Sequence, residues 1–341
     1  MSEFKYISND EVKEILTFKK SIELAEETLI EHFNDQVDWQ NPREAELWPR
    51  DRDEIATMYK VKGCIFRKLG FAGFRILSLN RTPAGYEIAS TRPTKHDLLS
   101  DVKTGEFLAI VDEHWGHAVR TGACAAVAVK HLMVKGVIEC AMIGSGYMAY
   151  TSLYALKEVM NLKKVKVWSR TKENREAFAK RMTDELNIEV IATDDAKECV
   201  KDMKVVITVT SAKKPFLRKE WFAPGVFIYA MGNNQEVDLA TYKEMSFYVD
   251  ERKQVLVCSD INELAEKGIY SEDWIVADLA EVVALPEKGR KNDEEQIVLR
   301  SRGVATQDIY QSYWIYKEAE RRGKGISLES AFDGRENEPL F

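Results

Sequence analysis

The chain has 341 residues, of which 45% are hydrophobic and 31% charged, a composition typical of a soluble globular protein with room for two domains. Its formal net charge is −7 and its basic residues are scattered among acids, which disfavours a nucleic acid or an anionic membrane as partner. No apolar run approaches the length of about 18 residues that a membrane span needs, and MSEFKYISND lacks the apolar centre of a secretion signal. The five cysteines are dispersed and never spaced C-x-x-C, so we expect free thiols in a reducing cytoplasm.

The first part of the chain predicts two helices followed by a sheet. Ser8 precedes Glu11 by three residues, the spacing of a capping box at a helix start. Apolar residues recur at helical spacing from Ile22 to Phe33 and predict a second, amphipathic helix. Short β-rich runs between residues 55 and 112, such as GCIFRKLGFAGFRILSLN, predict an antiparallel or mixed sheet.

Strands and helices alternate between residues 117 and 305. The strand segments, among them IECAMIG, KVKVWS, KVVITVTS and GVFIYAMG, are apolar without period-two alternation, as a parallel sheet covered on both faces requires. The pattern predicts an α/β protein with a doubly wound Rossmann domain over residues 117–305. We expect Thr193 to cap the helix DDAKECVKDM, and the apolar stripe from Ile309 to Tyr316 of a final helix to pack on the first domain.

The sequence GSGYMA at residues 144–149 is a G-x-G-x-x-A pattern between a predicted strand and a predicted helix. In this context Gly144 permits a tight turn, Gly146 lets the backbone approach a pyrophosphate, and Ala149 lets the helix pack closely on the strand. A β–α turn without a ligand is the alternative. The absence of G-K-[ST] excludes a phosphate-transfer loop.

The end of the second strand indicates which dinucleotide is bound. Ser169 stands where a carboxylate would bind the ribose hydroxyls of NAD, and Arg170, Thr171 and Lys172 follow it. A hydroxyl and two cations suit a 2′-phosphate, which favours NADP(H), with NAD(H) as the alternative cofactor. Arg170 as an ordinary solvated charge is the other interpretation.

Several motifs together resemble the ornithine cyclodeaminase/mu-crystallin family: VRTGACAAVAVKHL, the glycine turn, VWSRTKENREAFA, the stretch from VVITVTS to IYAMG, and GRKNDEEQIVLRSRGVATQDIYQSYWIYKEA. The resemblance covers about residues 118–320, with 1–117 fitting in outline, and WSRTKENREAFA is similar to the NADPH-binding mu-crystallin branch. It implies a homodimer in which a smaller α+β substrate-binding and dimerisation domain, 1–116 completed by 306–341, carries the Rossmann domain 117–305 as an insertion. Family members interconvert amino acids and imines by hydride transfer, or cyclise a diamino acid.

The resemblance also implies roles for individual residues. Arg120 and Thr121 would bind the substrate carboxylate, which agrees with the bidentate geometry of a guanidinium; an inter-domain salt bridge is the alternative for Arg120. We expect His117, one turn before Arg120 on the predicted helix, to line the substrate site, with Arg50 as a further anchor. The predicted cofactor-binding residues are Gly144, Ser145, Gly146, Tyr147, Met148, Ser169, Arg170, Thr171, Lys172, Thr208, Val209, Thr210, Met231, Gly232 and Val304.

Two positions depart from the family pattern. Arg75 stands where the family has a lysine, and an arginine is a poor proton shuttle although a good electrostatic clamp. The loop GNNQEVD is short, so Asn234 replaces the catalytic aspartate, while Asp238 is expected to cap the next helix. Lys95 or His96 could supply a general acid in their place, although a solvated loop is an equal reading of that segment.

Three functions remain after these arguments. The leading hypothesis is an NADP(H)-dependent oxidoreductase that reduces a carboxylated imine, in the manner of an amino-acid dehydrogenase or ketimine reductase. The alternatives are a deaminating cyclase with bound NAD(P)+ and a non-catalytic, crystallin-like small-ligand binder. His114 and His117 have a spacing that could ligate a metal, but no fourth ligand is suggested and we expect none.

Overall fold

The computed structural model describes residues 3–50, 57–80, 93–232, 235–257 and 260–329. Its residues form two compact units. The first combines the chain up to Thr17 with Asp35–His117 and the chain from Ala305 onward, and the second combines Phe18–Asn34 with Ala118–Val304.

The first unit is built on a mixed sheet with the strand order β16-β1-β7-β6-β5-β4-β2, in which β3 also pairs with β4. Among the described strands of this sheet only β1 and β7 are parallel neighbours, which agrees with the expected antiparallel or mixed sheet. The strands are β1 (Glu3–Ile7), β2 (Val37–Trp39), β3 (Ala45–Leu47), β4 (Thr57–Phe66), β5 (Phe71–Asn80), β6 (Lys95–Asp101), β7 (Phe107–Asp112) and β16 (Ile326–Glu329).

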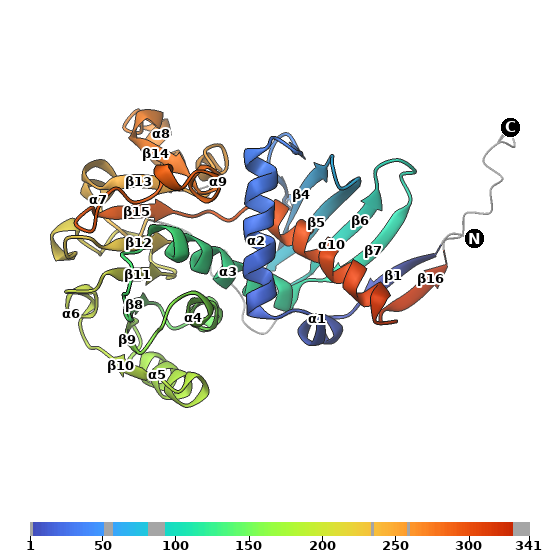
Figure 1. The fold of residues 1–341 in the computed structure, drawn as a ribbon. Coiled ribbons are helices and arrows are strands. Elements are labelled where there is room, and N and C mark those ends of the chain that lie inside the picture. The colour runs from blue at the N-terminus through green and yellow to red at the C-terminus, as the bar shows by residue number, and fades with distance from the viewer. Residues whose placement is uncertain (1–2, 51–56, 81–92, 233–234, 258–259, 330–341) are drawn as a thin grey trace, which may run out of the picture. The chain divides into compact units, whose positions relative to one another are not determined.

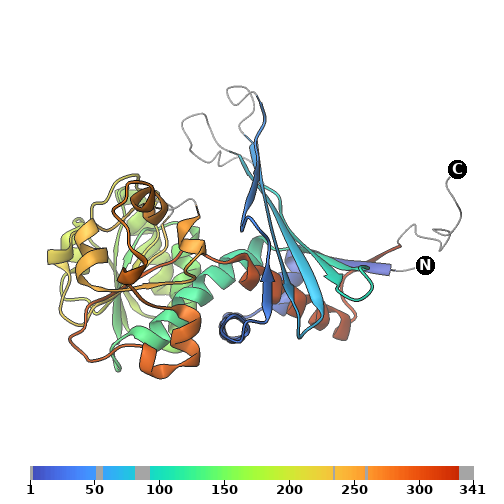
Figure 2. The ribbon, with the colours of Figure 1, turned by 90° about the horizontal axis from the view of Figure 1, so that it is seen from above.

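Helix α10 (Ala305–Arg321) lies along one face of this sheet (Figures 1 and 2). Ile309 and Ile315 of α10 are buried, and Tyr313 stacks on Phe71 of β5 with ring centroids 3.8 Å apart. The predicted apolar stripe of this final helix is thus confirmed. The other helix of the unit, α1 (Asn9–Ile15), begins at the predicted capping box, in which the Glu11 N–H donates to Ser8.

The second unit is built on a parallel sheet with the order β10-β9-β8-β11-β12-β15-β13-β14. The chain runs outward from β8 to β10 and then returns to β11 on the other side of β8, so the strand order reverses between β8 and β11, the position at whose carboxyl end open α/β sheets bind ligands. The strands are β8 (Glu139–Ile143), β9 (Lys164–Trp168), β10 (Glu189–Ala192), β11 (Val205–Thr208), β12 (Phe227–Ala230), β13 (Ser246–Val249), β14 (Ile275–Asp278) and β15 (Ile297–Arg300).

Helices cover both faces of the parallel sheet (Figure 1). Strand residues alternate between two buried clusters: Cys140 and Met142 belong to one, and Ala141 and Ile143 to the other. Burial on both faces explains the continuous apolar strands and confirms the doubly wound prediction. The first cluster is completed by α2 (Phe18–Phe33), α3 (His114–Leu132), α4 (Tyr147–Val159), α5 (Lys172–Leu186) and α9 (Leu279–Ala284); the second by α6 (Ala196–Val200), α7 (Leu239–Glu244) and α8 (Asp260–Glu266). Single-turn 3₁₀ helices lie at η1 (Lys219–Trp221), η2 (Gln254–Leu256), η3 (Glu272–Trp274) and η4 (Pro286–Lys288).

Helix α2 shows where the compact units differ from the sequence-based boundaries. The boundary at residue 116 placed this helix in the first domain, whereas its Ile22, Ala25 and Leu29 pack in the core of the second unit. The amphipathic helix itself is confirmed up to Leu29, but Phe33 is 42% exposed.

The expected cap of α6 is wrong. Asp195, two residues after Thr193, accepts from the N–H groups of Lys197 and Glu198. Thr193 instead donates its hydroxyl to the Val167 carbonyl, because the chain is still leaving β10 at that point.

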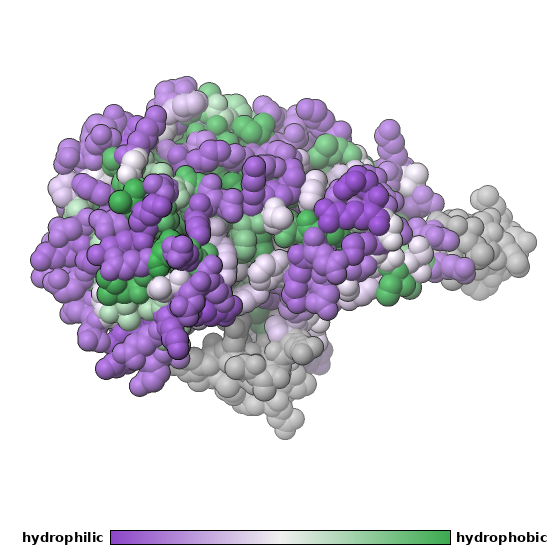
Figure 3. All heavy atoms as spheres, turned by 60° about the horizontal axis from the view of Figure 1, so that its bottom comes forward, coloured by the Kyte–Doolittle hydropathy of each residue, from purple (hydrophilic) through white to green (hydrophobic). Residues whose placement is uncertain are grey.

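No helix among the described residues is both long and apolar enough to cross a bilayer. On the face shown in Figure 3, hydrophilic side chains predominate and hydrophobic ones form small separate patches.

Candidate active site

The glycine turn joins β8 to α4. Gly144 has φ +123°, and a Cβ there would lie 2.5 Å from the Val209 carbonyl oxygen, so another residue type would be strained and crowded. A Cβ at Gly146, the N-cap of α4, would meet no protein atom within 4 Å, and no side chain caps the helix. The free space and the absence of a side-chain cap at this helix N-terminus fit a pyrophosphate, and buried Ala149 brings α4 close to the sheet. Of the other predicted residues, Tyr147 is exposed and Met148 half-buried.

The ribose end of this site lies after β9. Ser145 donates its hydroxyl to Ser169 Oγ over 2.8 Å, and Ser169 donates to the Thr171 carbonyl over 3.3 Å. Arg170, Thr171 and Lys172 are exposed, and Arg170 makes no ion pair with any residue of the described ranges. Within residues 169–172 this strand end therefore offers hydroxyls and cations, and no carboxylate.

A buried carboxylate ties the carboxyl ends of β11 and β12 together. Glu236, 1% exposed, accepts from the Thr208 hydroxyl and the Thr210 N–H, both over 2.6 Å, and from the Gly232 N–H over 2.8 Å. Burial raises the pKa of Glu236 despite these donors. These three hydrogen bonds of Glu236 hold two predicted cofactor-binding segments together, Thr208–Thr210 and Met231–Gly232. Val209, in the first segment, contributes the carbonyl that faces Gly144.

Sequence reasoning missed Glu236. In the loop GNNQEVD the residues expected to matter are Asn234 and Asp238. Asn234 lies outside the described residues. The predicted capping of α7 by Asp238 is confirmed, since Asp238 accepts a hydrogen bond from the Thr241 N–H. A carboxylate in a short loop that follows a buried apolar strand was the available signal.

Arg120 lies on α3 and is 7% exposed. Its Nη1 would lie 3.1 Å from a Cβ at Gly303, so the guanidinium lies close to the backbone beside buried Val304. That backbone is fixed by Asp250, which accepts from the Arg302 and Gly303 N–H groups over 2.6 and 2.5 Å. Thr121, the other predicted carboxylate ligand, follows Arg120 on α3 and is half-buried.

Arg75 of β5 lies in a buried charge cluster of the first unit. Its Nε and Nη2 both lie 2.6 Å from Glu113 Oε1, and its Nε lies 3.7 Å from Asp308 Oδ1. Burial lowers the pKa of Arg75, but Asp308 and Glu113 outweigh it and raise the pKa above its usual value. The guanidinium therefore stays charged and is largely engaged by protein carboxylates.

His117 and Asp97 complete this cluster. His117 Nδ1 lies 3.1 Å from Arg75 Nη2 and 3.2 Å from Asp308 Oδ1. Asp97, opposite Arg75 in the sheet, accepts from the Ser312 hydroxyl over 2.6 Å; burial and Glu113 raise its pKa well above the usual range. We call these residues the Arg75 network: Arg75, Asp97, Glu113, His117, Asp308 and Ser312.

The roles of Asp308 and Ser312 were not predicted from the sequence. They stand four residues apart on α10 and share its buried face, where polar residues interrupt the apolar stripe. That interruption was the signal that could have found them.

The other predicted acids lie elsewhere. His96 pairs with Ile76, whereas Asp97 pairs with Arg75, so His96 points to the opposite face of the sheet from the Arg75 network. Burial lowers the pKa of His96. Lys95 is half-buried and shares the face of Asp97, and Arg50 is exposed at the end of a described segment.

The two histidines considered as metal ligands, His114 and His117, contact different groups. His114 contacts Asp112 and the Pro93 carbonyl, each over 2.6 Å. Ligand atoms of Glu113, His117 and Asp308 lie within 4.8 Å of one another, but the Arg75 guanidinium already lies against both carboxylates. A guanidinium in that place disfavours a cation.

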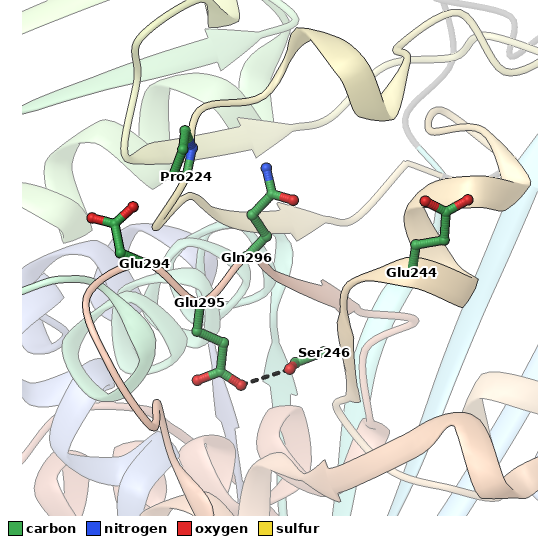
Figure 4. A pocket seen from close by; sticks show the side chains of 6 residues that line it. All are labelled: Pro224, Glu244, Ser246, Glu294, Glu295 and Gln296. Atoms are coloured by element: carbon green, nitrogen blue, oxygen red, sulfur yellow. Dashed lines mark hydrogen bonds between the residues drawn. The ribbon is translucent and has the colours of Figure 1, made fainter.

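A hollow on the second unit lies at the opposite edge of the parallel sheet from the glycine turn. Its lining residues lie at the amino ends of β12, β13 and β15, and Ser246 donates to Glu295 across it (Figure 4). They are Pro224, Glu244, Ser246, Glu294, Glu295 and Gln296. Three glutamates would repel a pyrophosphate, so we assign the nucleotide to the glycine turn.

The sequence matches the family model for the ornithine cyclodeaminase/mu-crystallin family over residues 7–323, and the chain belongs to this family. It is 33% identical over 242 residues to the ketimine reductase mu-crystallin of Macropus fuliginosus, covering 68% of this chain and 72% of that protein. It is 30% identical over 238 residues to the Δ1-pyrroline-2-carboxylate reductase of Bacillus cereus, covering 68% and 73%.

Solved structures of related enzymes have a similar fold. The Δ1-pyrroline-2-carboxylate reductase of Thermococcus litoralis, in complex with NADH and L-proline, has a TM-score of 0.86 and 26% identity, covering 95% of this chain and all of that one. An archaeal alanine dehydrogenase dimer with bound NAD has a TM-score of 0.87 at 24% identity, covering 96% and 99%, and supports the fold. The chain is an NAD(P)-dependent oxidoreductase of this family.

Proposed function

We propose that the enzyme reduces a carboxylated imine with NADPH, or oxidises the corresponding amino acid in reverse. The choice of reaction rests on one observation: Arg75 is buried and ion-paired with Glu113. Where the family resemblance calls for a lysine, this chain has a buried guanidinium that cannot exchange a proton near neutral pH. Imine reduction does not need a proton-shuttling lysine at that position, whereas deaminating cyclisation must move protons on and off an amine. The names of the relatives, which include pyrroline-carboxylate and ketimine reductases, support the same choice.

The described residues fit the parts of this reaction. The bound dinucleotide would supply a hydride, with its pyrophosphate at Gly144–Gly146 and the 2′-phosphate near Ser169 and Arg170. Arg120, held beside the backbone at Gly303, would bind the substrate carboxylate through a charge-assisted pair. The substrate is thus a small amino or imino acid.

We predict that NADPH binds more tightly than NADH and that Ser169→Asp reverses the preference. The new carboxylate would lie against the 2′-phosphate and could accept from the ribose hydroxyls of NADH. Fluorescence titration of both nucleotides measures the two affinities. Ser271→Asp, the same exchange beside η3, serves as control and should leave the ratio unchanged. Equal or tighter NADH binding by the unmodified protein would contradict the assignment.

We also predict that the enzyme does not convert ornithine to proline. With Arg75 ion-paired, that position offers no base to remove and return protons at the substrate amine. Product analysis after incubation with ornithine and NAD+ or NADP+ tests this directly. Proline and ammonia formed without net change in the cofactor would establish the cyclase alternative instead.

We further propose a homodimer located in the cytoplasm. The sheet face opposite α10 in the first unit carries Phe74 and Tyr59, each 45% exposed, and apolar side chains of this kind favour a protein partner. The four cysteines within the described residues, Cys64, Cys124, Cys140 and Cys199, are free and buried, as expected for a reducing compartment.

A further inference from the structure

The reduction of a neutral imine needs a proton for the nitrogen as well as a hydride for the carbon. The sequence left the proton donor open between Lys95 and His96, and the structure places His96 on the sheet face away from Arg75. His117 is a third titratable side chain, and its imidazole can donate a proton near neutral pH.

The surroundings of His117 suit a ring that cycles between charged and neutral forms. Asp308 Oδ1, 3.2 Å from Nδ1, can accept from a protonated Nδ1 and fix the ring with Nε2 as the exchanging nitrogen. Asp308 is fully buried, whereas 20% of the His117 side chain is exposed. The ring is therefore held at Nδ1 and is partly exposed.

Charged groups from every neighbouring element balance a protonated His117. Arg75 of β5 lies 3.1 Å from Nδ1 and would repel the proton, but Glu113, the residue just before α3, is ion-paired with this guanidinium. Asp97 of β6 holds its own proton, since burial and Glu113 raise its pKa, and burial likewise keeps Cys64 of β4 a neutral thiol. Two carboxylates, Glu113 and Asp308, then face two cations, Arg75 and His117, and the network is neutral when His117 is protonated.

The position of His117 follows from the geometry of α3 alone. His117 and Arg120 stand three residues apart in this continuous helix, so both side chains lie on the same face about one turn apart. The residue proposed to bind the substrate carboxylate, Arg120, is thus one turn from His117 on the same helix.

We propose that His117 is the proton donor of the imine reduction and that Asp308 is its positioning residue, an inference that rests on the proposed function. In the reduction, bound NADPH would supply the hydride to the imine carbon and would be oxidised by two electrons. The π pair of the C=N bond takes the proton from His117 Nε2, which leaves an amine and a neutral imidazole protonated at Nδ1. Solvent then returns a proton to Nε2.

The test compares His117→Gln and Asp308→Asn with His131→Gln, a matched control at the far end of α3 whose ring contacts Glu26. NADPH oxidation with Δ1-pyrroline-2-carboxylate is followed as a function of pH. The unmodified enzyme should lose kcat at high pH as the donor loses its proton. His117→Gln should lower kcat by about 10²–10⁴-fold and abolish that limb, with NADPH affinity and circular dichroism unchanged. Asp308→Asn should move the limb to lower pH, because the imidazolium loses its carboxylate.

Chemical rescue provides a readout that a purely structural role would not give. His117→Gly should regain activity when imidazole is added, whereas His131→Gln should behave as the unmodified enzyme with or without it. A His117→Gln enzyme with normal kcat and an intact high-pH limb would overturn this inference but leave the proposed function standing. An unmodified enzyme that reduces no carboxylated imine would overturn the proposed function, and the inference with it.

Discussion

Replacing Arg75 with methionine is expected to lower the free energy of unfolding by about 3–5 kcal/mol at neutral pH, because removing one partner of a buried ion pair strands the other. Glu113, Asp97 and Asp308 are all buried around this guanidinium and would lose their main cation. Urea unfolding of both proteins measures the difference. Arg67→Met is the matched control, since Arg67 is exposed where it pairs with Asp35 and Asp38 in the same unit, and it should cost less than about 1 kcal/mol.

The loss in Arg75→Met should depend on pH in a defined direction. The folded-state pKa of Asp97 is raised, so its favourable contribution is present at low pH and is lost as the pH rises through that value. Arg75 lowers the pKa of Asp97, and its removal raises that pKa further. The variant should therefore approach the unmodified protein in stability as the pH falls, and drop further below it as the pH rises through the raised folded-state pKa of Asp97. A loss that is the same across the pH range would show that packing, and not charge, is what Arg75 supplies.

Replacing Arg120 with alanine is expected to lower kcat/KM for the imine about 30- to 5,000-fold, which corresponds to a loss of about 2–5 kcal/mol of transition-state stabilisation. The affinity for NADPH should stay nearly unchanged. The reason is the loss of a charge-assisted pair with the substrate carboxylate at a side chain that is 7% exposed. Steady-state kinetics and nucleotide titration of the same preparation separate the two effects.

Arg181→Ala, which removes an exposed guanidinium from α5, is the control and should leave both quantities unchanged. If Arg120→Ala turns over normally, the carboxylate is bound elsewhere, and Arg50 becomes the next residue to change. Arg75 is a weaker candidate than the sequence suggested, since its charge is engaged by Glu113.

Much of the second unit was predictable because its signals are local. Buried parallel strands are continuously apolar, and a tight β–α turn needs glycine at a positive φ, so β8, Gly144 and α4 could be placed from neighbouring residues alone. Ser169 and Arg170 were equally accessible, because they follow a recognisable strand end.

The Arg75 network could not be predicted in the same way. Its members come from β5, β6, α3, α10 and, for Glu113, the junction between β7 and α3, and Asp308 stands more than two hundred residues after Arg75 in the chain. A sequence shows that Arg75 differs from a family lysine, but it does not show which carboxylates surround the guanidinium. Glu236 was missed for a related reason: its partners Thr208, at the end of β11, and Thr210, just after it, stand 28 and 26 residues earlier in the chain.

The first unit is assembled from three separate stretches of chain, with α10 supplied by the last of them. During translation β4, β5, β6 and β7 leave the ribosome long before the helix that covers them, and Arg75 and Asp97 emerge before Asp308 and Ser312. Domains generally fold as units as the chain is synthesised. The second unit, whose last strand precedes α10, can thus fold while the first waits with an uncovered sheet and an incomplete charge cluster. Termination of synthesis inside α10 would leave nascent enzyme with a complete nucleotide fold and an unfinished partner unit, a natural target for chaperones and proteases.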